Sequence, residues 1–273
     1  LLALYSILRC LFTDKSKIVV VGSGFRQSKI IFDYMDSIYQ SSAVFRNLIG
    51  GGIREGPKRD IDRCSFHIGN SETIAIPIGD GQKIRGLRAT VTISDEFSSM
   101  NREIYEVVIR GFGSVSHKPI ERVKKMYNIE YFRERGMDLA VELEESELGI
   151  GNQNIISGTA YYSFNHFYEY YLKYKRIIES RGDPQKLSEI FDDGEIPQDF
   201  NWRDYSVARI PFFILPKGFM DESNVSQAKA LINTTLFGME YLSVFATDSN
   251  GFFKRSLIES CVTKEPVNLP SGP

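Results

Sequence analysis

Residues Ile84–Glu96 read Ile-Arg-Gly-Leu-Arg-Ala-Thr-Val-Thr-Ile-Ser-Asp-Glu. The β-branched centre of this stretch, Val91 to Ile93, predicts a short strand. Two adjacent carboxylates, Asp95 and Glu96, follow where that strand should end. Ligands of open α/β sheets gather at the carboxyl ends of strands, and an acidic pair there suits the Mg²⁺ and water chemistry of nucleoside triphosphate hydrolysis. A pair of solvated loop residues is the alternative, and this stretch alone does not choose between the two.

The start of the chain predicts helix, strand and helix, the rhythm of an α/β fold. Leu1–Phe12 is apolar and is expected to form a buried helix, and the β-branched run Ile18–Val21 suits a strand covered on both faces. Gly22-Ser23-Gly24 is expected to be a strand-to-helix turn, because no Gly-Lys-Ser/Thr of a phosphate-binding loop follows it. The next helix is expected over 26–39. Its apolar face is predicted to be Ile30, Ile31, Tyr34, Met35 and Ile38.

Further elements follow from the same patterns. A hairpin is predicted from Ser65–Ile68 and Thr73–Ile78, and a strand from Asn154–Ile156. Tyr161–Tyr174 reads as an aromatic-rich helix, whose stripe at helical spacing is expected to be core and not a platform for bases. The remaining predictions are a helix beginning near Pro119, a capping role for Asn101, a β-rich run over Tyr205–Ile214 and helical character over Val225–Phe237.

Composition limits the function classes. The 273 residues are 42% hydrophobic and 25% charged, which is ordinary for a soluble globular protein with a sizeable core. The net charge of −2 gives no global basic field of the kind that announces a nucleic-acid partner. The three cysteines are far apart and odd in number, which fits free thiols in a reducing compartment and argues against a zinc site. No stretch is long and apolar enough to predict a membrane span.

Four short motifs are spread over nearly the whole chain. In order they are Lys17–Gly22 with Arg26-Gln27-Ser28-Lys29 and a helix, Ile84-Arg85-Gly86 with Asp95-Glu96, Ser157-Gly158-Thr159 with an aromatic helix containing Asn165, Phe167 and Tyr168, and Phe237-Gly238-Met239-Glu240-Tyr241 with Gly251-Phe252-Phe253. Each is weak alone. Their order and spacing resemble the ATPase domain of the large terminase subunit of tailed bacteriophages, the motor that pumps DNA into the prohead. The resemblance implies an α/β fold of the three-layer P-loop NTPase type (RecA/ASCE-like), with a mostly parallel sheet flanked by helices.

The resemblance assigns roles to single residues. Asp95 matches the acidic residue of the Walker B motif, which holds Mg²⁺ directly or through water. Glu96 matches the catalytic carboxylate that activates water for attack on the γ-phosphate. Ser157, Gly158 and Thr159 match the coupling motif, which senses the γ-phosphate and passes the change to the parts that move DNA. A plain strand-to-helix turn is the alternative for these three residues.

Arg85 lies ten positions before Asp95, on the lead into the same strand. It resembles the arginine that some family members are proposed to offer in trans to the ATP of a neighbouring subunit. A guanidinium bridges phosphate oxygens and spreads their charge, so it could stabilise the transition state. Arg88 is a rival for this role, and a surface ion pair is the alternative for both.

The chain also departs from the family. The Walker A loop is missing, and Leu1–Phe12 resembles the helix that directly follows that loop, so we expect the loop to lie upstream. Residues 1–245 are expected to be the ATPase domain, and 246–273 a linker toward a C-terminal nuclease domain that the chain does not contain. The predicted Walker B strand is more polar than usual, with Thr92 and Ser94, and Ser94 is expected to face a polar neighbour.

The resemblance implies a Mg²⁺-dependent ATPase that drives double-stranded viral DNA into the prohead, with ATP and Mg²⁺ as cofactors. The implied partners are double-stranded DNA, a portal protein, a small terminase subunit and further copies of the chain in a ring, in the cytoplasm of an infected bacterium and outside the virion. The 273 residues alone are expected to be inactive, and nuclease activity is expected only from the absent domain. A helicase-like DNA translocase, and an α/β module that binds DNA or a portal without hydrolysis, are the alternatives.

Overall fold

The computed structural model describes residues 1–50, 55–79, 81–116, 118–146, 151–198, 200–247 and 261–262. Within it the chain forms two compact units, Leu1–Gly158 and Thr159–Pro273. The boundary between them directly follows the first two residues of the expected coupling motif. Nearly all of the expected linker over 246–273 lies outside the described residues, so the assignment of 1–245 and 246–273 stays an expectation.

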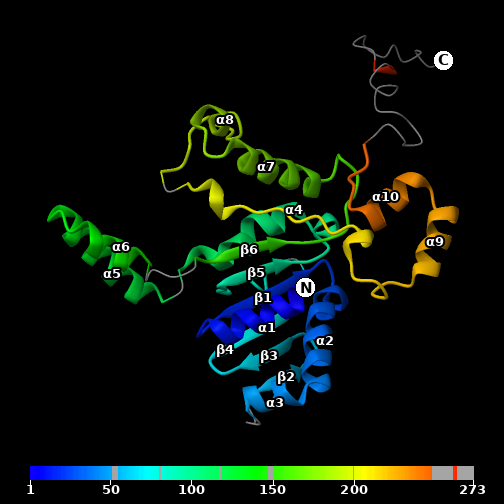
Figure 1. Ribbon diagram of the computed structural model, residues 1–273, viewed down its shortest axis with the longest axis horizontal. Coiled ribbons are helices and arrows are strands. Elements are labelled where there is room, and N and C mark those ends of the chain that lie inside the picture. Colours follow the sequence, from blue (N-terminus) through cyan, green and yellow to red (C-terminus); the bar gives the residue numbers. More distant parts are fainter. Residues whose placement is uncertain are drawn as a thin grey trace, which may run out of the picture. The chain divides into compact units, whose positions relative to one another are not determined.

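The first unit is built on a mixed six-stranded sheet, counted over the described residues, with the order β2-β3-β4-β1-β5-β6 (Figure 1). Strand β1 pairs in parallel with β4 and β5, and β5 pairs in parallel with β6. Strands β2 and β3 add antiparallel pairs at the other edge. The strands are β1 (Lys17–Gly22), β2 (Gly56–Arg59), β3 (Cys64–Ile68), β4 (Ser71–Pro77), β5 (Val91–Ser94) and β6 (Gln153–Ile156). The predicted α/β class is confirmed.

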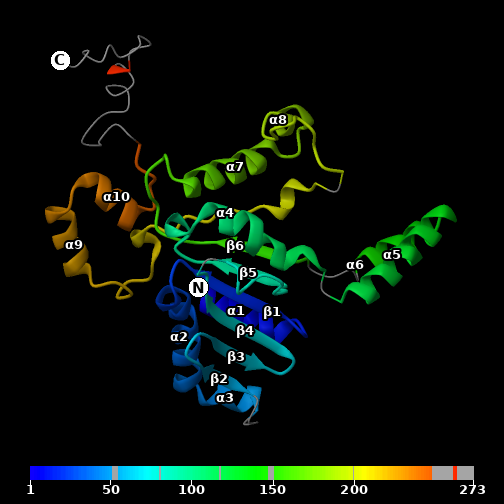
Figure 2. The same cartoon turned by 180° about the vertical axis from the view of Figure 1, so that it is seen from behind.

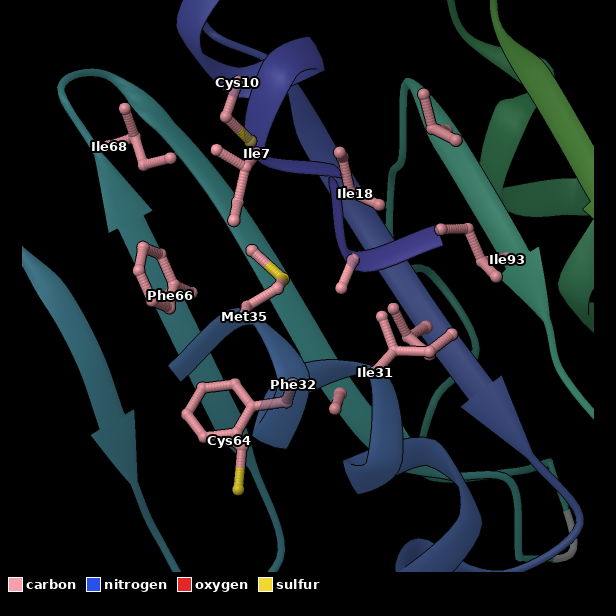
Figure 3. Packing of buried hydrophobic residues seen from close by; sticks show 14 of the residues in the cluster. Ile7, Cys10, Ile18, Ile31, Phe32, Met35, Cys64, Phe66, Ile68 and Ile93 are labelled. Carbon is pink, nitrogen blue, oxygen red and sulfur yellow. The ribbon is translucent and has the colours of Figure 1, made fainter. Parts of the chain in front are cut away.

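The main core lies between one face of the sheet and helices α1 (Leu2–Phe12) and α2 (Phe25–Ser41). Figure 3 shows Ile7 and Cys10 of α1 and Ile31, Phe32 and Met35 of α2 beside the strands. Helix α3 (Ala43–Ile49) adds Phe45, whose ring stacks on that of Phe66 in β3 with 6.3 Å between ring centroids. The continuous run over β1 is buried on both faces, as its β-branched composition predicts.

Two predicted helix faces need correction. Helix α1 buries only one face, because Leu4, Leu8 and Phe12 are exposed, so it is amphipathic and not a fully buried helix. Helix α2 buries Phe32 with Ile31 and Met35, whereas Ile30 and Tyr34 of the predicted face are exposed. The apolar side chains of α2 surround much of the helix, so contact with the sheet decides which of them are buried.

The opposite face of the sheet is covered by the chain that follows β5. Val19, Val21, Thr92 and Ser94 alternate with the core residues of β1 and β5, so they point to this second face, and all four are buried. The covering segment is a short 3₁₀ turn (Phe97–Ser99), helix α4 (Arg102–Ile104), a π-helical turn (Tyr105–Ile109) and a second 3₁₀ turn (Arg110–Ser114). As predicted, Asn101 caps α4, with its side chain accepting a hydrogen bond of 3.0 Å from the Ile104 N–H.

Helices α5 (Pro119–Glu134) and α6 (Asp138–Ser146) complete the first unit as a hairpin (Figure 2). Pro119 occupies the first turn of α5, as predicted. The hairpin expected near residue 70 is confirmed, although its loop is shorter than predicted because β4 already begins at Ser71. No helix in the described part of the chain is both long and apolar enough to cross a lipid bilayer.

The second unit is helical and rich in aromatic side chains. Its helices are α7 (His166–Ser180), α8 (Pro184–Ser188), α9 (Glu222–Leu231) and α10 (Thr234–Leu242). Helix α7 begins later than predicted, because the Asn165 side chain caps it by accepting a hydrogen bond of 2.9 Å from Phe167 N–H. The aromatic stripe is core only in part: Tyr168 and Tyr171 each pack on Phe245, while Phe164 is exposed.

Two predictions in this unit are corrected. Tyr205–Ile214, described throughout, forms no strand and ends in a 3₁₀ turn that follows Pro211, a residue unable to donate a ladder hydrogen bond. The helical run over Val225–Phe237 is two helices, because Asn233 caps α10 and separates it from α9.

Candidate functional site

The candidate site lies where β5 and β6 end side by side. The two strands run in parallel with Ser94 opposite Ile156, so the residues after each strand emerge at the same edge of the sheet. Asp95 and Glu96 follow β5, and Ser157 follows β6. This placement of the predicted residues on neighbouring strand ends is what a ligand site of an open α/β sheet requires.

Ser157 connects the two strand ends directly. Its hydroxyl donates a hydrogen bond of 2.6 Å to Asp95 Oδ1. Its backbone N–H donates to the Ser94 carbonyl, and its carbonyl accepts from the Phe97 N–H, both at 2.9 Å. Three hydrogen bonds therefore hold Ser157 against the Ser94–Phe97 segment, and its hydroxyl fixes the orientation of the Asp95 carboxylate.

Glu96 has an unusual backbone. Its φ of 50° and ψ of 48° lie in the left-handed region, which is costly for a residue with a Cβ. The next residue along the neighbouring strand end, Gly158, passes very close to it. A Cβ at position 158 would lie 3.3 Å from Glu96 Cα and 3.1 Å from Phe97 N. Strained backbone of this kind is concentrated at functional sites, and here it turns Glu96 away from the path of β5.

The end of β1 supports the same edge. The Asp95 N–H donates a hydrogen bond of 2.9 Å to the Val21 carbonyl. The turn after β1 is a strand-to-helix turn, as predicted, and Gly22 lets the backbones approach closely there, because a Cβ would lie 3.0 Å from Ser28 N. Sequence reasoning missed the role of Gln27, whose side chain accepts a hydrogen bond of 3.0 Å from Gly24 N–H. The Gln three residues after the cap is a capping-box signal that would have identified it.

Phe97 and Tyr105 form a buried aromatic pair directly after the two carboxylates. The Phe97 ring is fully buried and lies edge-on to the Tyr105 ring, with 4.6 Å between centroids. Tyr105 opens the π-helical turn, a feature often found beside functional sites. Neither aromatic residue was singled out from the sequence, because an isolated Phe after an acidic pair carries no spacing signal.

The polar residues of β5 do not behave as expected. Ser94 was expected to face a polar neighbour, but the buried hydroxyls of Ser94 and Thr92 make no hydrogen bond to any described residue. Both side chains point to the sheet face covered by the segment after Phe97.

Arg85 and Arg88 precede strand β5, whereas Asp95 and Glu96 follow it. Both arginines are exposed, and they belong to the connection between the carboxyl end of β4 and the amino end of β5. Within the part of the chain that the structure describes, the Arg85 guanidinium makes no hydrogen bond or ion pair. The Arg88 side chain donates one hydrogen bond of 3.5 Å, to the Leu87 carbonyl, and none to any other described residue. Among the described residues, the structure therefore shows no surface ion pair for either arginine and brings neither to Asp95.

The remaining residues of the four sequence motifs lie in the second unit or outside the described residues. Thr159, the third residue of the expected coupling motif, is the first residue of the second unit. Phe237–Tyr241 lies within α10, and Gly251–Phe253 lies outside the described residues.

Asp95 is the residue that could hold a divalent metal. Its Oδ1 accepts the Ser157 hydrogen bond, and its Oδ2 has no partner among the described residues. The described residues contain no cluster of three or more His, Cys, Asp or Glu side chains that could enclose an ion. A single carboxylate fits Mg²⁺, which usually keeps several waters and binds one or two carboxylates together with the phosphates of its substrate.

The chain is similar to solved structures of phage proteins. No protein-family model matches it, and no curated protein matches it. The large terminase from a thermophilic bacteriophage is 8% identical with a TM-score of 0.46, and the match covers 89% of this chain and 44% of that one. The same phage's large terminase in complex with ATP-γ-S is 8% identical with a TM-score of 0.44, covering 89% and 43%. The Thermus phage P74-26 large terminase ATPase domain is 13% identical with a TM-score of 0.42, covering 90% and 82%. The chain thus spans less than half the length of the first two of these chains.

Proposed function

We propose that this chain is part of an ATP-hydrolysing motor that moves double-stranded viral DNA into a prohead. The observation that carries the proposal is the 2.6 Å hydrogen bond from Ser157 to Asp95, made beside a Glu96 in left-handed conformation. Two adjacent carboxylates and a hydroxyl lie on neighbouring strand ends, where a sheet of this class binds phosphates. A solvated acidic loop has no need for a fixed carboxylate or a strained neighbour.

Asp95 takes the metal-binding role in this proposal. The Ser157 hydroxyl holds Oδ1, so Oδ2 is the oxygen available to Mg²⁺ or to one of its waters. Mg²⁺, when bound with ATP, neutralises the negative charge of the phosphates. The aspartate needs a fixed orientation for this task, which the bond across the strand ends supplies.

Glu96 takes the role of the base that orients water. Glu96 follows β5 with a left-handed backbone, and we propose that its carboxylate leaves the sheet in a different direction from that of Asp95. Different directions let one carboxylate serve the metal and the other accept a proton from the attacking water.

Ser157 and Gly158 are proposed to transmit the state of the phosphates. Ser157 contacts both Asp95 and Phe97, and Gly158 packs on Glu96, so a shift of the carboxylates on hydrolysis must displace the end of β6. The chain from β6 leads directly into the second unit through Thr159, the third residue of the proposed coupling motif.

Arg85, or its rival Arg88, is proposed to act on the ATP of a neighbouring subunit. Each is exposed, and neither forms an ion pair within the described residues. An exposed cation without an ion-pair partner among the described residues is free to reach a second active site, as a ring of identical subunits would need.

The proposed partners are double-stranded DNA, a portal protein and a small terminase subunit, and the proposed location is the cytoplasm of an infected bacterium. The 273 residues contain no Gly-Lys-Ser/Thr, so we propose that these residues alone do not hydrolyse ATP. The same gap motivates the competing function, an α/β module that binds DNA or a portal without hydrolysis.

The test is phosphate release from ATP by the full-length gene product, measured with Mg²⁺ and with EDTA, in the presence and absence of blunt duplex DNA. Mg²⁺-dependent release without strand separation is the expected result. Duplex unwinding would indicate the helicase-like alternative. Absence of hydrolysis in a folded full-length product would indicate the non-hydrolysing module and contradict the proposal.

A further inference from the structure

The loop between β4 and β5 has buried ends and an exposed middle. Gly81 and Ala89 are buried, whereas Arg85 and Arg88 between them are exposed. We call residues 81–89 the arginine loop. Two exposed cations are therefore carried on a loop whose ends pack against other residues of the first unit.

Both ends of the arginine loop contact the covering segment, which follows β5. At the first end, a Cβ on Gly81 would lie 3.0 Å from Ile104 Cγ2 and 3.3 Å from Val108 Cγ2. At the second end, the Ala89 N–H donates a hydrogen bond of 3.0 Å to the Phe112 carbonyl. One stretch of chain therefore determines where the arginine loop lies.

Gly81 suits this close contact in two ways. Its φ of 79° lies in the left-handed region, which glycine adopts without cost. The carbon atoms that it meets belong to Ile104 and Val108, whose β-branched side chains are stiff at χ1 and do not turn away easily. A larger residue at position 81 would therefore push the arginine loop away from the covering segment.

The covering segment also contacts the residue next to the acidic pair. It begins with Phe97, directly after Glu96, and the Phe97 and Tyr105 ring centroids are 4.6 Å apart. Tyr105 and Val108 belong to the same π-helical turn. This turn thus contacts both Phe97, beside the catalytic carboxylate of the proposed function, and Gly81, at the start of the arginine loop.

We propose that Gly81 is a positioning residue: its contact with Ile104 and Val108 places the arginine loop for its action on ATP. The proposal rests on the proposed function, in which Arg85 or Arg88 acts on the phosphates. Because the covering segment begins after Glu96, the carboxylate and the guanidinium are placed by the same stretch of chain.

The expected size of the effect follows from the precision that a phosphate-binding guanidinium needs. A misplacement of about 1 Å can cost about a hundredfold in rate. An added Cβ at position 81 would lie 3.0 Å from Ile104 Cγ2, so either the side chain or the loop must move to admit it. A residue that served only to terminate β4 would affect stability and not turnover.

The first test uses the 273-residue chain without nucleotide. Trypsin cleavage after Arg88 is compared with cleavage after Arg63, which is exposed in the same unit and reports overall unfolding. Gly86→Ala is the matched control, because Gly86 also has a positive φ, of 86°, but a Cβ there meets nothing within 4 Å. Gly81→Ala should raise the ratio of the two cleavage rates about fivefold or more above that of the control.

A second variant relieves the proposed clash. Ile104→Ala removes both Ile104 carbons that would lie within 4 Å of the added Cβ. In this background Gly81→Ala should change the cleavage ratio less than it does in the unaltered chain. If Gly81→Ala alone does not fold, the double variant compared with Ile104→Ala gives the same information. Equal ratios in Gly81→Ala and Gly86→Ala would overturn the proposal.

The second test measures ATP turnover and ATP binding by the full-length gene product. Gly81→Ala should lower turnover about tenfold or more, while the affinity for ATP stays within about twofold. Arg85→Ala and Arg88→Ala set the scale, since Gly81→Ala should fall no lower than the less active of these two. Gly81→Ala with the turnover of the unaltered product would overturn the proposal.

Failure of this proposal and failure of the proposed function give different results. An unaltered full-length product that does not hydrolyse ATP would contradict the proposed function and, with it, the role of Gly81 in turnover. Hydrolysis by the unaltered product and by Gly81→Ala at the same rate would contradict only the role of Gly81. The trypsin comparison involves no ATP, so it decides the contact with Ile104 in either case.

Discussion

The Ser157 hydroxyl donates a hydrogen bond of 2.6 Å to Asp95 Oδ1 across the ends of two parallel strands that are 62 residues apart in sequence. The Ser157 carbonyl accepts a second hydrogen bond from the Phe97 N–H, so the serine contacts both sides of Glu96. The end of β6 is thereby fixed to the acidic pair at the end of β5. An enzyme that couples hydrolysis to movement needs a mechanical connection of this kind.

Replacement of Ser157 tests that connection. Ser157→Ala should lower ATP turnover by the full-length gene product about ten- to hundredfold, because a hydrogen bond to a charged group is worth about 1.5–3 kcal/mol. Ser157→Thr keeps the hydroxyl and should retain most of the turnover. Equal turnover in all three proteins would show that the bond to Asp95 has no catalytic role.

Gly158 tests the close packing on Glu96. Gly158→Ala should lower the free energy of unfolding by about 1–3 kcal/mol, because the new Cβ would meet the backbone of Glu96 and Phe97. Gly111→Ala is the control, since a Cβ there meets nothing within 4 Å. Urea unfolding of the 273-residue chain measures both variants. A Gly158→Ala variant as stable as the control would contradict the packing described here.

The strain at Glu96 has its own signature. Glu96→Gly and Glu96→Ala both remove the carboxylate, but only glycine adopts φ of 50° without cost. The glycine variant should therefore be more stable than the alanine variant by about 1 kcal/mol in thermal or urea unfolding. The opposite order would mean that residue 96 is not left-handed in solution.

The strands of the site were predictable from sequence, and their contacts were not. The β-branched run of β5 and the Asn154–Ile156 run each predict a strand, and both are observed. Hydrophobic periodicity predicts each strand but not the order of the strands in the sheet. It therefore could not show that β5 and β6 are neighbours. The left-handed Glu96 packs on Gly158, a residue distant in sequence, so no local rule could have identified this contact.

Helix faces show the same limit. Ile30 and Tyr34 have the right spacing for burial in α2, yet Phe32 is buried in preference to them. Hydrophobic spacing identifies the helix, whereas the position of β3 and β4 decides which side is covered. In Tyr205–Ile214 the β-favouring composition is real, but no neighbouring strand is present among the described residues to pair with it.

The buried thiol of Cys10 predicts a pH dependence of stability. Burial raises the pKa of Cys10 from 9.0 to about 11, against a weaker opposing effect of the hydrogen bond with Thr73. The folded state therefore keeps a proton that the unfolded state releases, so this contribution to stability is complete below pH 9 and declines between pH 9 and about 11. At pH 10 the loss should be roughly 1 kcal/mol.

Urea unfolding at pH 8 and pH 10 measures the Cys10 contribution. The decrease in the free energy of unfolding between these two pH values should be smaller in Cys10→Ala than in the unaltered chain. Cys10→Ala also leaves a cavity, but that cost is the same at both pH values and cancels in the comparison. An identical pH dependence in both proteins would show that Cys10 ionises alike when folded and unfolded.

Whether Glu96 activates water for hydrolysis is measured most directly by comparing Glu96→Gln with the unaltered full-length gene product. Glutamine keeps the size and hydrogen-bonding reach of the side chain but cannot accept the proton. In Glu96→Gln, Mg²⁺-dependent phosphate release should be abolished while the affinity for ATP, measured by equilibrium binding, should be retained. Phosphate release by Glu96→Gln at the rate of the unaltered protein would contradict this role of Glu96.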